Sequence, residues 1–385
     1  MQLSRQEEAA LAGEEGYAIQ LAYRVLLATG KATNADRLEP VSWAHLSGVN
    51  YNTIGDAGES FLAEISAKAR VKIKTTVNPM GYDIDSVSKY DLGEKFVQKQ
   101  ESIRESYLRM GITPLFSCVP YDVLDMPASK TRVAFAESNA AIFANSVADL
   151  ETNKESAFSA LASAITGKSP YSESAVNQEP EITLRVKIKD PNEIAYGMLG
   201  YFAGKTGTSA PVALSCSNTP DRRQCKAICG GMGTSGTCSK FVLGQGGSES
   251  EKIDFGPEEM STIKDELSTT EQGDIITLGS PQLGLEEISL LSAMLKGRSF
   301  KKRCMVFTPR IIRDKARRLG YTAGIEAAGA EILVDCCTCL TPLINKDEVD
   351  AVITNSIKGA YYLKNSTRVQ VNLKSLSEIV KEVTV

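Results

Sequence analysis

Histidine is nearly absent from the sequence: His45 is the only one among 385 residues. A histidine-rich zinc site, a two-histidine iron site and an HExxH protease motif each need more than one histidine, so all three are excluded. A Ser-His-Asp triad would have to use His45. This residue is therefore either a structural histidine or a single catalytic group.

Long apolar runs and a strong excess of charge are also missing. No stretch of about 18 unbroken apolar residues occurs, so no transmembrane helix is expected. The first residues do not combine a basic region with an apolar run, so no signal peptide is predicted. Lys and Arg total 43 and Asp and Glu total 47, a formal net charge of −4. We therefore expect a cytoplasmic protein that binds neither nucleic acid nor membrane.

Cysteine, in contrast, is abundant, with nine residues. An odd number in a reducing compartment argues against a disulfide framework and leaves buried small residues, a metal site, or both. Three cysteines lie in the segment 335–339 after a predicted strand, and Cys118 ends another, so these thiols would suit an iron–sulfur or zinc site. A second group has spacings that fit no common zinc ribbon, and its role stays open: Cys216, Cys225, Cys229 and Cys238.

Alternating strands and helices predict an α/β fold with a doubly wound parallel sheet in the last hundred residues. In such sheets ligands bind in the loops at the carboxyl ends of the strands, here after Val334 and Thr354. Strands are predicted at 71–77, 113–119, 182–188, 303–308, 332–334, 349–354 and 369–371. Helices are predicted at 7–29, as one helix or two, at 92–110, as a pair within 138–166, at 309–319, and from 372 to 383.

Residues 203–250 are rich in Gly, Ser, Thr and Cys and show little periodicity, so they are predicted to be irregular. The hexapeptide 231–236, Gly-Met-Gly-Thr-Ser-Gly, matches GxGxxG. It neither follows a clear strand nor opens a clear helix, so a dinucleotide site is not expected. It either presents backbone N–H groups to an anionic substrate or forms a flexible loop.

Several segments taken together resemble the aconitase X family. The matches are collinear, span nearly the whole chain, and are most similar to the archaeal branch, the large subunits of phosphomevalonate dehydratases; a sister branch dehydrates cis-3-hydroxyproline. The segments are DRL at 36–38, AHLSGVNYNTIGDAG at 44–58, TTVNP at 75–79, SCVPY at 117–121, AESN at 136–139, FANS at 143–146, DCC at 335–337, and Asn355-Ser356 with Lys358 and Tyr362.

The resemblance implies three-layer α/β/α lobes as in aconitase, without the small swivelling domain, and we place the lobes at 1–125, 126–295 and 296–385. It implies a hydro-lyase that removes water from a small anionic hydroxy acid such as mevalonate 5-phosphate. Iron, as an iron–sulfur cluster or a mononuclear centre bound by three cysteines, would act as Lewis acid on the leaving hydroxyl. A base would remove the proton from the adjacent carbon. A separate small swivelling-domain subunit is the expected partner.

Candidate site residues follow from positions in the matching motifs. Cys118 and Cys337 match two metal-ligand positions, and Ser280 stands at the third. The candidate catalytic residues are His45, Glu137, Ser138 and Asn145. The candidate substrate-binding residues are Asn78, Asn153, Lys154, Thr234, Ser235, Gly236, Ser356 and Lys358.

The sequence also departs from the family pattern. A Gly-Cys-Pro-His motif is expected where the sequence has Gly279-Ser280-Pro281-Gln282, so a cluster cysteine is Ser280 and a histidine is Gln282. An expected Arg-Thr-Asn-Arg reads Glu-Thr-Asn-Lys at 151–154, and lysine lacks the bidentate fork of arginine. A histidine expected after Phe241 is Val242.

Three hypotheses follow from these departures. The protein is a dehydratase in which Ser280 is a ligand or in which Cys336 or Cys339 substitutes for the missing thiol. Alternatively, it is a diverged paralogue with another substrate or reaction. In the third hypothesis it has lost catalysis and is a binding or regulatory subunit.

Overall fold

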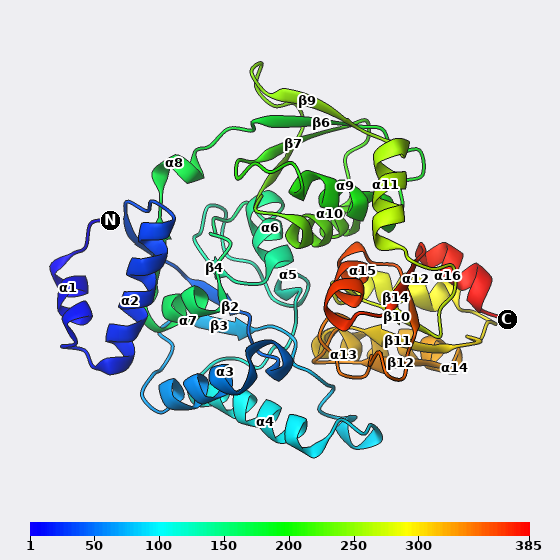
Figure 1. Ribbon diagram of the computed structural model, residues 1–385, viewed down its shortest axis with the longest axis horizontal. Coiled ribbons are helices and arrows are strands. Elements are labelled where there is room, and N and C mark those ends of the chain that lie inside the picture. Colours follow the sequence, from blue (N-terminus) through cyan, green and yellow to red (C-terminus); the bar gives the residue numbers. More distant parts are fainter.

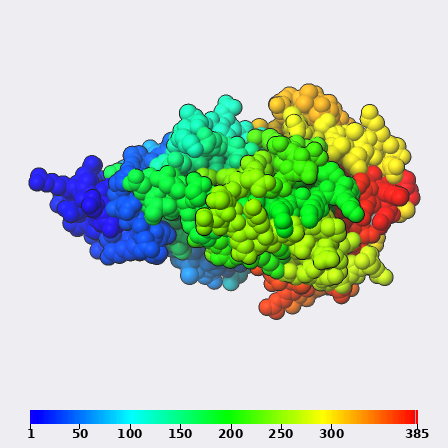
Figure 2. Space-filling model, turned by 90° about the horizontal axis from the view of Figure 1, so that it is seen from above, coloured from blue at the N-terminus to red at the C-terminus, as the bar shows by residue number. Residues whose placement is uncertain are grey.

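Three parallel sheets, each from a different part of the chain, organise the molecule (Figure 1). The computed structural model describes the whole chain, residues 1–385, except for the side chain at position 383. The molecule is elongated, and its N-terminal helices form one end (Figure 2). None of the helices in the described part is long and apolar enough to cross a membrane. The predicted α/β class with parallel, doubly wound sheets is confirmed.

The first lobe is built on a parallel sheet of order β3-β2-β4. All four residues of the central strand β2 are buried, and helix α7 packs against it. A two-stranded antiparallel pair, β1 and β5, extends this lobe. Its strands are β1 (Arg37–Pro40), β2 (Trp43–Leu46), β3 (Lys74–Val77), β4 (Ala134–Phe135) and β5 (Lys168–Tyr171). Its helices are α1 (Arg5–Ala12), α2 (Tyr17–Ala32), α3 (Tyr51–Ser66), α4 (Glu94–Arg109), α5 (Pro120–Val123), α6 (Ser138–Ser146), α7 (Ala157–Thr166) and α8 (Glu173–Val176).

The first lobe confirms most of the predicted elements and corrects one. The helical region 7–29 is two helices, because Gly13 ends α1 in the left-handed conformation with φ of 101°. Residues 113–119 are not a strand: they contact β3 through an isolated bridge at Thr113 and a hydrogen bond from the Ser117 N–H to the carbonyl oxygen of Val77 at 3.1 Å. Pro114 has no N–H to donate to a ladder, and Phe116 has φ of 44°, so the segment cannot stay extended.

The middle lobe carries a parallel sheet of order β8-β7-β6-β9. The prediction that 203–250 is irregular is wrong, since the segment contains two strands and a 14-residue helix. The hexapeptide 231–236 lies at the end of that helix and is not a loop. The elements are β6 (Ile182–Val186), α9 (Glu193–Gly204), β7 (Val212–Cys216), α10 (Arg222–Ser235), β8 (Phe241–Leu243), β9 (Glu251–Phe255) and α11 (Pro257–Leu267).

Glycines in this lobe allow α9 and α10 to pack closely. A Cβ on Gly231 would lie 2.0 Å from the carbonyl oxygen of Gly197, and one on Gly200 would lie 2.0 Å from that of Ile228. No side chain fits at such distances, so these glycines are required for helix packing. The GxGxxG match therefore reflects helix–helix contact, with no cradle of free N–H groups.

The third lobe is a five-stranded parallel sheet of order β12-β11-β10-β13-β14. The first strand of this lobe is the central strand β10, which was not predicted. The next two strands, β11 and β12, add to one side of it, and β13 and β14 add to the other. The reversal places the loops after β10 and β13 next to each other at the switch point, where such sheets bind ligands. The elements are β10 (Ile275–Leu278), α12 (Leu285–Met294), β11 (Arg303–Phe307), α13 (Arg310–Arg318), α14 (Tyr321–Ala327), β12 (Ala330–Leu333), β13 (Ala351–Thr354), α15 (Ile357–Tyr362), β14 (Gln370–Leu373) and α16 (Leu376–Val383).

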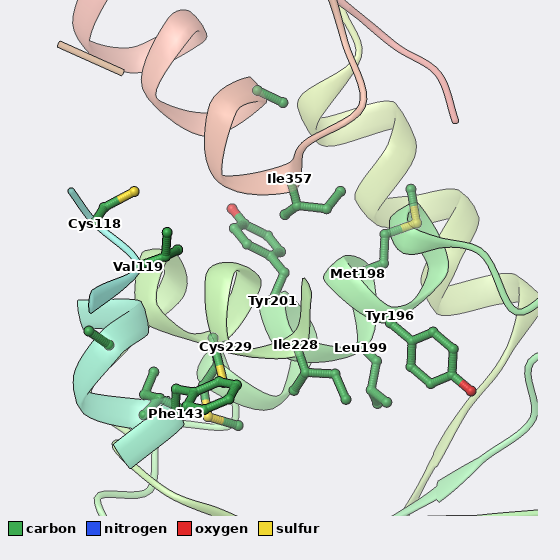
Figure 3. Close-up of a cluster of buried hydrophobic side chains, with 14 of the residues drawn as sticks. Cys118, Val119, Phe143, Tyr196, Met198, Leu199, Tyr201, Ile228, Cys229 and Ile357 are labelled. Carbon is green, nitrogen blue, oxygen red and sulfur yellow. The ribbon is translucent and has the colours of Figure 1, made fainter. Parts of the chain in front are cut away.

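One large hydrophobic cluster joins the three lobes. In Figure 3, Ile357 at the start of α15 lies over helix α9, which carries Tyr201 and Met198, and Cys118 and Phe143 come from the first-lobe side. The predicted limits near 125 and 295 stay predictions. From sheet membership we propose that the lobes change after β5 and before β10.

Candidate active site

The carboxyl ends of the first-lobe and third-lobe strands meet at the centre of the molecule. Asn78 follows β3 and Glu137 follows β4, whereas Ser280 follows β10 and Lys358 lies just after β13. Parallel strands place such residues along one edge of each sheet. Within the third-lobe edge, Ser356 Oγ donates to the carbonyl oxygen of Ser280. Between the two edges, Lys358 Nζ of the third lobe donates to Glu137 Oε1 of the first.

Glu137 and Lys358 form a buried ion pair between the lobes. Both residues are less than 9% exposed. The carboxylate also accepts Asn139 Nδ2 on Oε1 at 2.7 Å and Asn78 Nδ2 on Oε2 at 2.6 Å. Burial acts to raise the pKa of Glu137, but the Lys358 charge and the amide donors outweigh it and lower that pKa overall. Burial acts to lower the pKa of Lys358, and the charge of Glu137 raises it above its ordinary value. Both groups are therefore charged at neutral pH.

His45 is connected to this pair indirectly, through the side chain of Asn78. Its Nε2 is 2.9 Å from Asn78 Oδ1, and its Nδ1 is 2.8 Å from Thr76 Oγ1. The ring is fully buried, and burial lowers the pKa of His45 to about 4 although the charge of Glu137 acts in the opposite direction. The ring is therefore neutral at physiological pH. It reaches Glu137 only through Asn78.

Three thiols and one hydroxyl gather beside the ion pair. Cys118 Sγ accepts the backbone N–H of Gln282 at 3.3 Å, and Ser280 Oγ lies 2.9 Å from Cys339 Sγ. The thiols of Cys337 and Cys339 are hydrogen-bonded, which raises the pKa of Cys337 and lowers that of Cys339. Burial raises the pKa of Cys118 to about 12. Among the described residues, no group of three or more His, Cys, Asp or Glu side chains has the spacing of a metal site.

Gln282, at the position where a histidine was expected, ties the two cysteine loops together. Its Oε1 accepts the backbone N–H of Cys118 at 3.3 Å, and its Nε2 donates to the carbonyl oxygen of Cys336 at 2.9 Å. Its own carbonyl oxygen accepts Lys226 Nζ at 2.7 Å. Gln282 therefore links segments from all three lobes.

Several predicted site residues are engaged elsewhere. The Asn145 amide bonds to the backbone of Thr152 and Ser239 at 2.9 to 3.0 Å. The Asn153 amide donates to Glu155, Ser169 and the backbone of Pro170. The hydroxyls of Thr234 and Ser235 donate to carbonyl oxygens of their own helix. The roles assigned to these residues stay predictions, and the structure does not place their polar groups against Glu137.

Other predicted residues lie nearer the centre. Lys154 Nζ donates to the carbonyl oxygen of Gly236 at 2.6 Å, and burial lowers its pKa. Ser138 is the first residue of α6, directly after Glu137. Glu151, where the sequence reverses an expected charge, pairs with Arg132 at 3.5 Å. Arg132, in the same lobe, therefore neutralises the negative charge that Glu151 introduces.

A cavity of about 240 Å³ reaches this site between α9, α10, α12 and α15. Ser280, Ser356 and Lys358 are among the residues that line it. Lys226, which also lines it, was not predicted; it is buried and pairs with Glu287 at 2.5 Å and Asp122 at 3.1 Å. No sequence signal identified Lys226, since its partners are 61 and 104 residues away.

Comparison with known proteins agrees with this architecture. Family models described as the first, second and third domains of aconitase X match residues 1–177, 180–275 and 273–385. The phosphomevalonate dehydratase large subunits of Methanocaldococcus jannaschii and Thermococcus kodakarensis are each 32% identical, covering 99% of this chain and 100% of the relative. The cis-3-hydroxy-L-proline dehydratase of Pseudomonas aeruginosa is 27% identical, covering 97% of this chain and 68% of the relative.

The solved structures include a similar fold. The crystal structure of Thermococcus kodakaraensis aconitase X in its holo-form superposes with a TM-score of 0.90 at 30% identity and covers 100% of both chains. The chain belongs to the aconitase X family.

Proposed function

We propose that this chain is the large, catalytic subunit of a dehydratase that removes water from a small anionic hydroxy acid, with mevalonate 5-phosphate as its substrate. The observation that carries the proposal is the buried Glu137–Lys358 pair at the meeting edges of two sheets, beside a cavity. The names of the relatives that match over their full length support the same reaction and substrate. Their designation as large subunits supports a small subunit as partner.

Removal of water breaks a C–H bond and the neighbouring C–O bond, so a base must take the proton. Glu137 is the carboxylate in the cluster, but in the resting site Lys358 and two amides hold it ionised. An anionic substrate would compete with Glu137 for Lys358. Once the carboxylate loses that partner, its burial is no longer offset and its pKa rises, which makes it a stronger base.

The resemblance further implies iron at the cysteines. Thiolates are soft ligands that suit iron, so Cys118, Cys337 and Cys339, with the hydroxyl of Ser280, fit it in donor chemistry. We propose that Cys118 and Cys337 hold it, with Cys339 or Ser280 at the third position. Bound there, iron would supply the Lewis acid for the leaving hydroxyl.

The test is turnover of mevalonate 5-phosphate by the anaerobically reconstituted chain with a family small subunit, followed by ³¹P NMR of substrate and product. We expect product formation by the wild type and at least a 100-fold loss of kcat in Glu137→Gln. Glu151→Gln is the matched control, because it neutralises a carboxylate paired with Arg132 outside the cluster. No turnover by a folded, iron-loaded wild type would contradict the proposal.

Ser280 and Gln282 favour a second candidate, a paralogue that acts on another substrate or serves as a binding subunit. If mevalonate 5-phosphate binds without turnover, this candidate replaces the dehydratase.

A further inference from the structure

A continuous chain of hydrogen bonds connects the core of the first lobe to Glu137. Trp43 Nε1 donates to Thr76 Oγ1 at 2.8 Å, and Thr76 Oγ1 lies 2.8 Å from His45 Nδ1. His45 Nε2 lies 2.9 Å from Asn78 Oδ1, and Asn78 Nδ2 donates to Glu137 Oε2 at 2.6 Å. All five residues are less than 9% exposed, so water does not compete for these bonds.

The chemistry of the two ends fixes the direction of every bond in this chain. An ionised carboxylate can only accept, so Asn78 must turn its NH₂ group toward Glu137 and its carbonyl oxygen toward His45. His45 must then carry its hydrogen on Nε2, which leaves Nδ1 as an acceptor. An indole N–H can only donate, so the Thr76 hydroxyl accepts from Trp43 and gives its own hydrogen to Nδ1.

We propose that His45 is a positioning residue for Glu137: as the neutral Nε2–H tautomer it holds the Asn78 amide with its NH₂ group against the carboxylate. This inference rests on the proposed function, in which Glu137 is the base. If the amide were free to flip, its carbonyl oxygen would face the carboxylate and repel it. A buried histidine ring cannot drift, because Phe135 packs edge-on at 5.7 Å between ring centroids.

The surroundings of His45 favour the neutral ring. Glu137 is the charged group whose field acts on it, and that charge is offset by Lys358. The other hydrogen-bonding neighbours, the side chains of Thr76 and Asn78 and the backbone of Ser117, are uncharged. An imidazolium would have to donate from both nitrogens, so the Thr76 hydroxyl could no longer donate to Nδ1.

The test uses the fact that His45 is the only histidine, so an imidazole ¹⁵N spectrum has a single origin. In the wild type we expect the Nε2–H tautomer at pH 7. In Glu137→Gln, Lys358 and Asn139 still donate to the Oε1 position, so the new amide must place its oxygen there. Its NH₂ group then faces Asn78, which must flip, and His45 must switch to the Nδ1–H tautomer.

The matched control is Glu151→Gln. Its partner Arg132 is not part of the hydrogen-bond series from Trp43 to Glu137, so this variant should leave the wild-type spectrum unchanged. A switch in Glu137→Gln alone supports the inference. An Nδ1–H ring or an imidazolium in the wild type overturns it without any variant, as does an unchanged tautomer in folded Glu137→Gln. A histidine that only fills space would not respond to residue 137.

A second measurement connects the tautomer to turnover. Gln can place an N–H near the position of Nε2, so His45→Gln should retain kcat within a few fold, whereas His45→Leu should lower kcat at least 10-fold with KM unchanged. Equal kcat losses in both variants would overturn the positioning role. The spectra need neither substrate nor iron, so a tautomer switch in a protein without turnover would reject the proposed function and leave the coupling between His45 and Glu137 intact.

Discussion

Lys358 and Glu137 pair across the boundary between the third and first lobes, 221 residues apart in the sequence. Neither group has enough exposure to be solvated by water alone. The pair therefore couples the relative placement of two sheets to the charge state of the site. Any substrate anion that binds Lys358 changes the environment of Glu137 at the same time.

Loss of one partner should destabilise the protein strongly. Lys358→Met leaves the Glu137 carboxylate buried without its cation, and we expect a loss of about 3–5 kcal/mol in the free energy of unfolding. The double variant with Glu137→Gln should recover part of that loss. Urea unfolding measures both. The control is Lys130→Met, whose partner Asp149 is more than half exposed, with an expected loss of about 0–1 kcal/mol. A loss of that size for Lys358→Met would contradict the buried pairing.

Substitution at the helix contact should also be costly. A Cβ at Gly231 would overlap the carbonyl oxygen of Gly197, so Gly231→Ala must push α9 and α10 apart. We expect a loss of about 1–3 kcal/mol or more, seen as a lower Tm. Gly247→Ala is the control, because nothing lies within 4 Å of its added Cβ. Equal melting temperatures of the two variants would show that the helices pack less closely than described.

Four of the five third-lobe strands could be predicted because they read as short apolar runs, whereas the fully buried central strand β10 was missed. In the middle lobe the predicted strand at 182–188 is confirmed as β6, but the helix α10 within 203–250 was missed, since the partners of Gly231 are backbone atoms of Gly197 and Tyr201, some 30 residues away in sequence. A pattern search within six residues cannot distinguish a phosphate loop from a helix contact. The failed strand at 113–119 had a local sign, Pro114, whose missing N–H argues against a ladder.

The candidate site was predictable in its residues more than in their connections. The motifs identified Asn78, Glu137 and Lys358, and the structure brings them into contact. The same reasoning grouped Asn145 and Asn153 with them, although their amides bond within the first lobe and to the neighbouring backbone. Hydrogen bonds between distant segments leave no periodic trace in a sequence, so only the fold separates the two groups.

Stability should depend on pH through His45. Its pKa in the fold is about 4, below the 6.5 of an exposed histidine, so between these values the unfolded chain binds more protons. Stability from this group is therefore present at pH 7 and falls as the pH is lowered, by about 2 kcal/mol between pH 7 and 5. Urea unfolding at both pH values measures the difference. In His45→Gln the difference should shrink by that amount, and an unchanged pH dependence would show that the ring is not buried as a neutral group.

Iron content should distinguish the cysteines of the loop 335–339. Cys339 Sγ lies 2.9 Å from Ser280 Oγ, and its free thiol is hydrogen-bonded to that of Cys337, so it can replace the thiol that position 280 lacks. Cys336 belongs to the hydrophobic cluster, and its backbone carbonyl contacts Gln282. After anaerobic reconstitution, we expect near-stoichiometric iron in the wild type and in Cys336→Ala.

The same measurement should show iron lost in Cys118→Ala, Cys337→Ala and Cys339→Ala. Iron and sulfide analysis with a visible spectrum provides the readout, and circular dichroism confirms that each variant is folded. Retention of iron in Cys339→Ala would leave Ser280 as the third ligand, and Ser280→Ala would then lose it. A folded wild type that takes up no iron would contradict the proposed metal site.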